Sequence, residues 1–361
     1  METSRFSDLI KQYMGGIVLN WENRFNGTNQ AEPSPYYYDR WFPHEYSASG
    51  DFSSVETDNT VPMAYVIDYD SPLPLIKGQA IKIYNGEIPK IGVEIQSTEK
   101  KLTELNNLLL RGDKIGENQA VKILFTPLKK VYLAQKERLE WMALQLLSNG
   151  SAATNPTVNT GVNVLIEGNV PVTNLYNATI IWGQTNYAPL TDLERVKTSA
   201  KVNDGNDIVK FLIDRNMFNQ IRNSAEAKGL YNPLAANIPG LNLEQLNAVV
   251  QSQYGYIFEI VEKSVTIQKN GADTKLNPWK AGQAVGVVSE QLGATVWADL
   301  AESLDKKGGV DYQTAEEFIL LRKYKVVHPA YGEFTSSQSR SACVLTAPST
   351  IYRLDTTAVA V

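Results

Sequence analysis

Residues suited to acid–base or metal chemistry are scarce in this chain. It holds two histidines, His44 and His328, and one cysteine, Cys343. Two histidines cannot form a histidine-rich zinc site or the HExxH motif of zinc peptidases. His328 precedes Pro329, and Cys343 lies in the apolar run ACVL, where a small buried side chain is more usual than a nucleophile. We therefore expect structural roles for all three residues, with no metal or cofactor.

Motifs of the common enzyme classes are also missing. The sequence contains no GxSxG, no GxxxxGK[ST] and no GxGxxG, which removes the readily recognised hydrolase, P-loop and dinucleotide-binding classes. The acidic pairs Asp68/Asp70 and Glu316/Glu317 lack the spacing of a glycosidase or calcium site and suit solvated surfaces. We expect a chain without catalytic residues, and an enzyme with an unrecognised site is the alternative of another class.

The composition is typical of a folded protein with more than one domain. The 361 residues include 43% hydrophobic and 20% charged side chains, with a net charge of -5. That charge disfavours a surface built to grip nucleic acid. A single cysteine excludes an intrachain disulfide and suits a reducing cytoplasm. Because the sequence has no signal-like apolar core near residue 1 and no run of about 18 apolar residues, we expect no membrane association.

The stretch from residue 125 to residue 150 predicts one long helix, which we name the spine helix and place at residues 127–148. Thr126 can cap it, Pro127 suits the first helical position, and Gly150 follows its last turn. Its charged face, expected to meet solvent, holds Lys129, Lys130, Lys136, Glu137 and Glu140. Its core face, defined by apolar residues at helical spacing, holds Val131, Tyr132, Leu139, Met142 and Leu146.

Segments before the spine helix predict contacts with other surfaces. Residues 4–14 place apolar side chains on one helical face up to Gly15-Gly16, and this helix can dock on its own domain or on a partner. Residues 31–60 lack periodicity but are rich in aromatic rings, which need burial against another domain or another copy of the chain. Residues 61–84 predict a long hairpin. The candidate intersubunit contacts are Tyr36, Tyr37, Tyr38, Trp41, Phe42, Tyr65, Ile67, Tyr69, Ile81 and Ile83.

The order of these elements is similar to that of a known family. An aromatic arm and a long hairpin lead to a short helix and then to the spine helix, which ends in RLEWMALQLLSNG and is followed by VNVLIEGNVPVTNL. The closing glutamate, the small and apolar residues and the final glycine of that family's spine correspond to Glu140, Met142, Ala143, Leu146 and Gly150. The chain thus resembles the major capsid proteins of tailed phages, specifically the lambda-type capsid protein E family with the Hong Kong 97-type fold.

The resemblance implies an α+β fold, the Hong Kong 97-like phage capsid fold, with an N-terminal arm, an E-loop hairpin, a P-domain that holds the long spine helix, and an A-domain. The implied boundaries are residues 1–60 for the arm, 61–90 for the E-loop, 91–177 for the P-domain with its short helix, spine helix and strand pair, 178–308 for the A-domain, and 309–361 for the closing sheet of the P-domain.

The resemblance also implies a function and partners. The chain is expected to assemble with itself, as hexamers and pentamers, into an icosahedral head that encloses double-stranded phage DNA and contacts it without sequence specificity. Other expected partners are a scaffolding protein and a portal, with a decoration protein left open. The expected location is the virion, assembled in the host bacterial cytoplasm. A nanocompartment shell protein of the encapsulin type, enclosing protein cargo, is the alternative with the same fold.

Overall fold

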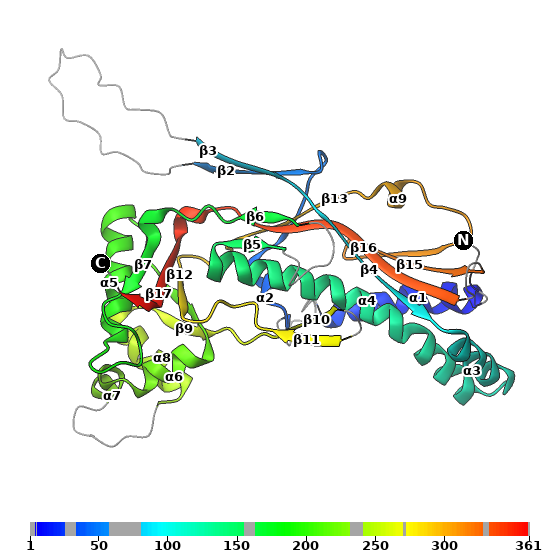
Figure 1. Cartoon of the computed structure of the whole chain (residues 1–361), viewed down its shortest axis with the longest axis horizontal. Helices are drawn as coiled ribbons and strands as arrows, with labels where there is room; N and C mark the ends of the chain where they lie inside the picture. The colour runs from blue at the N-terminus through cyan, green and yellow to red at the C-terminus, as the bar shows by residue number, and fades with distance from the viewer. Residues whose placement is uncertain are drawn as a thin grey trace, which may run out of the picture.

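The computed structural model describes residues 4, 6–25, 34–57, 81–154, 163–231, 241–269, 272–327 and 332–359. The molecule is elongated, and two lobes with separate hydrophobic cores lie along its long axis (Figure 1). The helices of the described residues are α1 (Ser7–Phe25), α2 (Tyr37–Trp41), α3 (Glu99–Leu110), α4 (Lys114–Asn149), α5 (Pro189–Asp204), α6 (Arg215–Asn223), α7 (Ala225–Tyr231), α8 (Leu243–Tyr254) and α9 (Ala301–Leu304), with short 3-10 helices η1 (Val172–Asn174) and η2 (Pro348–Thr350).

The larger lobe is a six-stranded sheet with α4 packed along it. The strand order is β1-β13-β16-β15-β14, and β4 pairs with β16 off this path. The first half of the long strand β16 pairs with β15 and β4, and its second half pairs with β13. These strands are β1 (His44–Tyr46), β4 (Lys90–Ser97), β13 (Gly293–Ala298), β14 (Asp311–Ala315), β15 (Ile319–Val326) and β16 (Gly332–Leu345).

The smaller lobe is a five-stranded sheet with α5, α6, α7 and α8 around it (Figure 1). Its strand order is β7-β17-β12-β8-β9. These strands are β7 (Leu175–Ala178), β8 (Lys210–Ile213), β9 (Ile257–Ile260), β12 (Gln283–Val287) and β17 (Ile351–Val359). Three further strand pairs are β2 (Asp51–Thr57) with β3 (Ile81–Glu87), β5 (Ser151–Ala153) with β6 (Leu165–Glu167), and β10 (Val265–Lys269) with β11 (Ala272–Leu276).

The spine helix is longer than predicted. It ends as expected, with Gly150 in the left-handed conformation at φ 80°, but it begins at Lys114 instead of Pro127. The Asp113 side chain caps this earlier start by accepting a hydrogen bond from the Gly116 amide at 2.8 Å. Pro127 therefore lies inside the helix, where its ring removes an amide donor and disturbs the preceding turn.

A buried lysine of the larger sheet contacts α4 one turn before Pro127. Lys323 of β15 donates a hydrogen bond from Nζ to the Leu124 carbonyl of α4 at 2.9 Å. Burial lowers the pKa of Lys323 to about 8. Pro127 removes the donor for the Ile123 carbonyl, four residues earlier, whereas Lys323 bonds the next carbonyl, that of Leu124. The helix begins before Pro127 because Asp113 caps the earlier start and Ala120 and Leu124 are buried.

Helix α1 also differs from its prediction, because it continues through Gly15 and Gly16 to Phe25. Two glycines inside a helix cost about 1 kcal/mol each relative to alanine. Burial of Ile10, Met14 and Val18 along one face offsets that cost. Tertiary packing therefore decides the length of this helix.

The expected division at residue 308 is corrected by the strand pairing. β13, within the segment expected to form the A-domain, belongs to the six-stranded sheet of the larger lobe. β17, within the expected closing sheet, pairs in the smaller lobe, where Tyr352 and Leu354 are buried in the second core. The chain crosses between the lobes because each strand joins the sheet whose core its apolar side chains fill.

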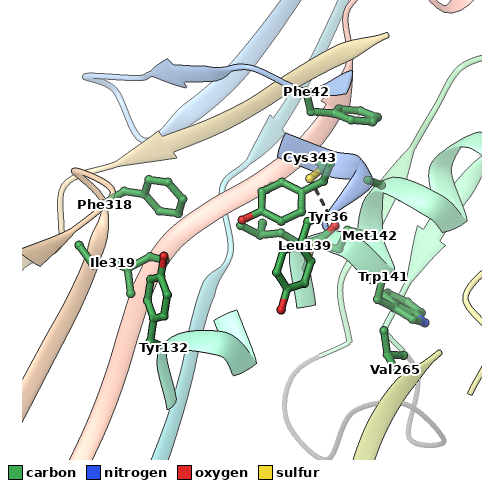
Figure 2. Close-up of a cluster of buried hydrophobic side chains, with 14 of the residues drawn as sticks. Tyr36, Phe42, Tyr132, Leu139, Trp141, Met142, Val265, Phe318, Ile319 and Cys343 are labelled. Atoms are coloured by element: carbon green, nitrogen blue, oxygen red, sulfur yellow. Dashed lines mark hydrogen bonds between the residues drawn. The ribbon is translucent and has the colours of Figure 1, made fainter. Parts of the chain in front are cut away.

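The core of the larger lobe contains the predicted core face of the spine helix. Val131, Tyr132, Leu139, Met142 and Leu146 are all buried. Figure 2 shows Leu139 and Met142 beside Cys343 of β16 and the aromatic rings of Tyr36 and Phe42. Residues from the beginning, middle and end of the chain therefore share one core.

Replacing Leu139 with alanine should lower the free energy of unfolding by about 2–5 kcal/mol, because a fully buried leucine leaves a cavity. Leu110→Ala is the matched control, since that helical leucine is 76% exposed and its loss should change stability by less than about 0.5 kcal/mol. Urea unfolding of both variants measures the difference. Equal effects at the two positions would contradict the proposed role of the α4 core face.

Candidate functional site: the arm docked on the spine helix

Four of the five aromatic contact candidates before residue 45 are buried within their own chain. We call residues 34–46, which contain α2 and β1, the docked arm. The relative exposure is 0% for Tyr38 and Phe42, and Tyr36 and Trp41 are also buried, while Tyr37 is partly exposed. These four candidates for intersubunit contact are therefore buried against their own chain. The sequence left open whether these rings pack against another domain or against another copy of the chain. In the structure they pack against other residues of the same chain.

The backbone of the docked arm is joined to the larger sheet. β1 pairs in parallel with β13, in the register His44 to Thr295 and Tyr46 to Trp297. The Thr295 hydroxyl also donates to the Phe42 carbonyl at 3.0 Å. The arm is thus an edge of the sheet on one side and a contact of α4 on the other.

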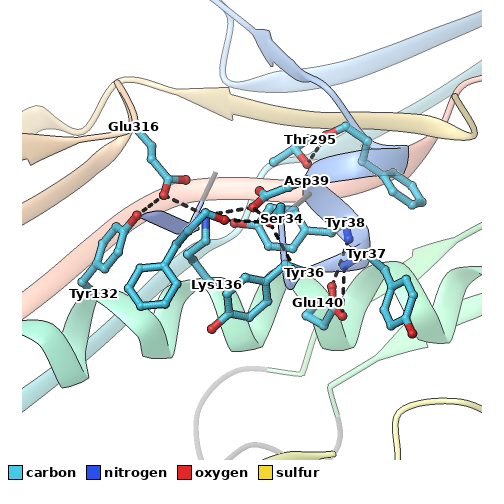
Figure 3. A network of polar contacts seen from close by, with 12 residues as sticks. Ser34, Tyr36, Tyr37, Tyr38, Asp39, Tyr132, Lys136, Glu140, Thr295 and Glu316 are labelled. Atoms are coloured by element: carbon cyan, nitrogen blue, oxygen red, sulfur yellow. Dashed lines mark hydrogen bonds and ion pairs between the residues drawn. The ribbon is translucent and has the colours of Figure 1, made fainter. Parts of the chain in front are cut away.

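A buried ion-pair cluster lies where the docked arm, α4 and the turn between β14 and β15 meet (Figure 3). Lys136 of α4 has no exposed side-chain surface, and its Nζ lies 3.0 Å from Asp39 Oδ2 and 2.8 Å from Glu316 Oε1. The Tyr132 hydroxyl donates to the same oxygen of Glu316. Burial, followed by the charge of Glu316, raises the pKa of Tyr132, so the phenol stays protonated and remains a donor.

Aromatic rings surround the Lys136 ammonium. Its Nζ lies 5.4 Å from the ring centres of both Tyr36 and Tyr38 and 5.9 Å from that of Tyr132. Cations are attracted to the faces of such rings, and more strongly where water is excluded. Tyr36 and Tyr38, two of the predicted intersubunit contacts, therefore lie beside a buried charge of their own chain.

Glu140, one helical turn after Lys136, binds the backbone of the docked arm. Its two carboxylate oxygens accept hydrogen bonds from the amides of Tyr37 at 3.2 Å and Tyr38 at 3.0 Å. The side chain is fully buried, and burial raises its pKa to about 7 even though both hydrogen bonds favour the charged form. Docking of the arm therefore depends on a carboxylate that titrates near neutral pH.

The docked arm also contacts the chain where it leaves the smaller lobe. The Tyr37 hydroxyl donates to the Ile260 carbonyl at 3.1 Å, and Arg40 pairs with Glu259 at 2.6 Å. Ile260 and Glu259 belong to β9 of the five-stranded sheet. A short segment near the N-terminus therefore connects the spine helix to the second lobe.

The other residues singled out in the sequence are Cys343, His328 and the contact candidates of the hairpin. Cys343 is buried against the Leu139 carbonyl, and burial raises the pKa of its thiol, which disfavours the reactive thiolate. His328, Tyr65, Ile67 and Tyr69 lie outside the described residues. Ile81 and Ile83 lie in β3, but their side chains are also outside the described part.

Among the described residues, no helix is both long and apolar enough to span a bilayer.

The charged residues of this cluster are buried, although their sequence pattern predicts surface positions. The pattern places Lys136 and Glu140 on the solvated face of the spine helix and Glu316 on a solvated surface, whereas all three are buried. A signal was present, because Tyr132, Lys136 and Glu140 are spaced four apart and continue the apolar stripe. The prediction gave more weight to the charges of Lys136 and Glu140 than to their position on the apolar face of the helix.

The sequence matches one family model, and the fold matches solved structures. The family described as phage major capsid protein E matches residues 28–356. A prophage capsid protein from Escherichia coli CFT073 is 12% identical, with a TM-score of 0.56 over 94% of this chain and 98% of the other. A phage-related protein from Bordetella bronchiseptica RB50 is 11% identical, with a TM-score of 0.50 over 92% and 96%. No curated protein matches. The predicted Hong Kong 97-like fold is confirmed.

Replacing Lys136 with methionine should destabilise the protein by about 3–5 kcal/mol, because Asp39 and Glu316 would remain buried without their cation. Arg215→Met is the control: Arg215 pairs with Glu262 at the surface, both side chains are 52% exposed, and the loss should be at most about 1 kcal/mol. Urea unfolding at neutral pH measures both. If the two losses are alike, the Lys136 cluster does not stabilise the fold as proposed.

Glu140 should make stability depend on pH between its ordinary pKa of 4.5 and about 7. In that range the folded protein holds a proton that the unfolded chain releases, so stability falls as pH rises, by about 3 kcal/mol in total. Glu140→Gln should remove this contribution, visible as a changed difference in unfolding free energy between pH 5 and pH 7.5. Glu262→Gln should leave this difference unchanged, because Arg215 lowers the pKa of Glu262. An unchanged pH dependence in Glu140→Gln would contradict the assignment.

Proposed function

Because this chain belongs to the phage major capsid protein E family, we propose that it assembles through hexamers and pentamers into the icosahedral head shell that encloses phage DNA. The observation that carries this proposal is the family match over residues 28–356, which includes both lobes, the spine helix and the docked arm. The prophage capsid protein with the same fold supports it. The chain acts as a structural protein, and we assign it no catalytic residue or cofactor.

The lobes suit the domains of a shell subunit. We assign the larger lobe, with α4 and the six-stranded sheet, to the peripheral P-domain, and the smaller lobe to the axial A-domain near the centre of each capsomer. The β2–β3 pair belongs to the E-loop. The docked arm is the part of the N-terminal arm that remains on its own subunit, since its tyrosines enclose Lys136 of the same chain.

The β2–β3 pair is the strongest candidate for contact with a neighbouring subunit. The two strands pair only with each other among the described residues, and they extend away from both lobes (Figure 1). A two-stranded hairpin is marginally stable in water by itself. Packing on the next subunit would supply the missing apolar contacts, at about 25 cal/mol per Å² of apolar surface buried.

A shell built in this way needs contacts that are individually modest. Weak contacts let misplaced subunits dissociate, while many contacts per subunit make the closed shell persistent. An elongated subunit with a projecting strand pair can touch several neighbours at once. Further partners of this proposal are a scaffolding protein during assembly, a portal, a decoration protein as an option, and packaged DNA contacted without sequence specificity. The particle would be the virion head, assembled in the host bacterial cytoplasm.

The alternative within the same fold is a nanocompartment shell that encloses protein cargo. The content of particles isolated from producing cells separates the two. The capsid proposal expects nuclease-protected double-stranded DNA, and the nanocompartment alternative expects a co-purifying protein inside. A discrete small oligomer under all conditions would contradict both and favour an enzyme with an unrecognised site.

The projecting strand pair offers a direct test of assembly. Thr57 and Ile81 are paired opposite each other, so residues 58–80 can be replaced by Asn-Gly, which forms a two-residue hairpin turn. This variant should keep the melting temperature of the parent subunit but form no closed shells in negative-stain microscopy under conditions where the parent chain does. Normal shells from the shortened chain would contradict the E-loop assignment. Unfolding of the variant would count against an intersubunit role for the replaced segment.

A further inference from the structure

Three potential metal ligands converge beside Lys136. One ligand atom each of Asp39, His44 and Glu316 lies within 4.8 Å of the other two. They come from α2, from β1 and from the turn between β14 and β15. The Lys136 cluster described above uses only part of this group, since His44 forms none of its ion pairs.

The two carboxylates keep coordination capacity after pairing with Lys136. The ammonium contacts Asp39 through Oδ2 and Glu316 through Oε1. The other oxygen of Glu316, Oε2, is buried and has no hydrogen-bond partner among the described residues. A buried oxygen without a partner is costly, and each such group calls for a physical explanation. A bound ion at Oε2 would supply the missing partner without displacing Lys136.

The charge balance of the cluster also favours a cation. Asp39 and Glu316 contribute two negative charges against one positive charge on Lys136, and the nearby Tyr132 phenol is neutral. His44 is exposed, which gives an ion a path from solvent. Phe318 meets the His44 ring edge-on, with 5.0 Å between the two ring centres.

The donor set indicates the class of ion. One imidazole nitrogen with two carboxylate oxygens suits zinc and similar divalent transition metals, whereas calcium and magnesium prefer oxygen ligands alone. Three protein ligands leave a fourth position for water. Lys136 would then hold the carboxylates from outside the coordination sphere, as hydrogen-bonding partners of metal ligands commonly do.

We propose that Asp39, His44 and Glu316 bind one divalent transition-metal ion of the zinc class, which ties the docked arm to the β14–β15 turn. The ion joins residues 39 and 44 to residue 316, so it acts as a structural cross-link between the two ends of the chain. This inference rests on side-chain geometry and not on the capsid function.

The test uses full-length, tag-free protein treated with a chelator and then titrated with Co²⁺ and with Zn²⁺. We expect one ion per chain to bind, with visible absorption from protein-bound Co²⁺ and a higher melting temperature in Zn²⁺. His44→Ala should weaken binding at least about tenfold, as loss of a ligand costs more than about 1.4 kcal/mol. Because His44 takes no part in the ion pairs, this variant should fold normally, which circular dichroism checks.

The chain's other histidine provides the matched control. His328→Ala should retain the affinity and the Co²⁺ spectrum of the parent protein. Binding that is lost in His328→Ala but kept in His44→Ala would overturn the proposed site. Binding only at millimolar metal, with the same strength in parent and His44→Ala proteins, would show adventitious association and would also overturn it.

Discussion

The burial of the Lys136 ammonium is the constraint on which the arrangement of this subunit depends. Removing a charged group from water costs several kcal/mol even after the protein relaxes. That cost is offset only when Asp39, Glu316 and the surrounding tyrosine rings are all in place. These groups come from the docked arm, the spine helix and the β14–β15 turn of the larger sheet. One buried charge therefore requires three distant segments to meet in a single arrangement.

The docked arm, which carries Asp39, also contacts the smaller lobe. Glu140 holds the amides of Tyr37 and Tyr38, and the Tyr37 hydroxyl reaches the Ile260 carbonyl in β9. The docked arm therefore lies between the spine helix and the smaller sheet. For a shell subunit, this contact would help to set the relative position of the two lobes, while the projecting β2–β3 pair is left free for a neighbour.

Local signals predicted some features well and others poorly, for physical reasons. Gly150 ends α4 as expected, because a left-handed C-terminal residue is a property of the local backbone. Pro127 does not start the helix, because Asp113 caps an earlier start and the turns before the proline bury Ala120 and Leu124. The family and fold were predictable from the order of elements. The burial of Tyr38, Lys136 and Glu140 was not predictable, since it arises from contacts between residues that are 102 positions apart for Tyr38 and Glu140 and 180 apart for Lys136 and Glu316.

A cryo-electron microscopy reconstruction of assembled particles tests the central claim most directly. The account predicts an icosahedral shell in which residues 34–46 of every subunit lie on that subunit's own spine helix, with Tyr38 beside its own Lys136, while the segment between β2 and β3 lies on a neighbour. A shell in which Tyr38 of one subunit packs against Lys136 of another would contradict the docked arm. Particles without icosahedral order would contradict the role as a head-shell subunit.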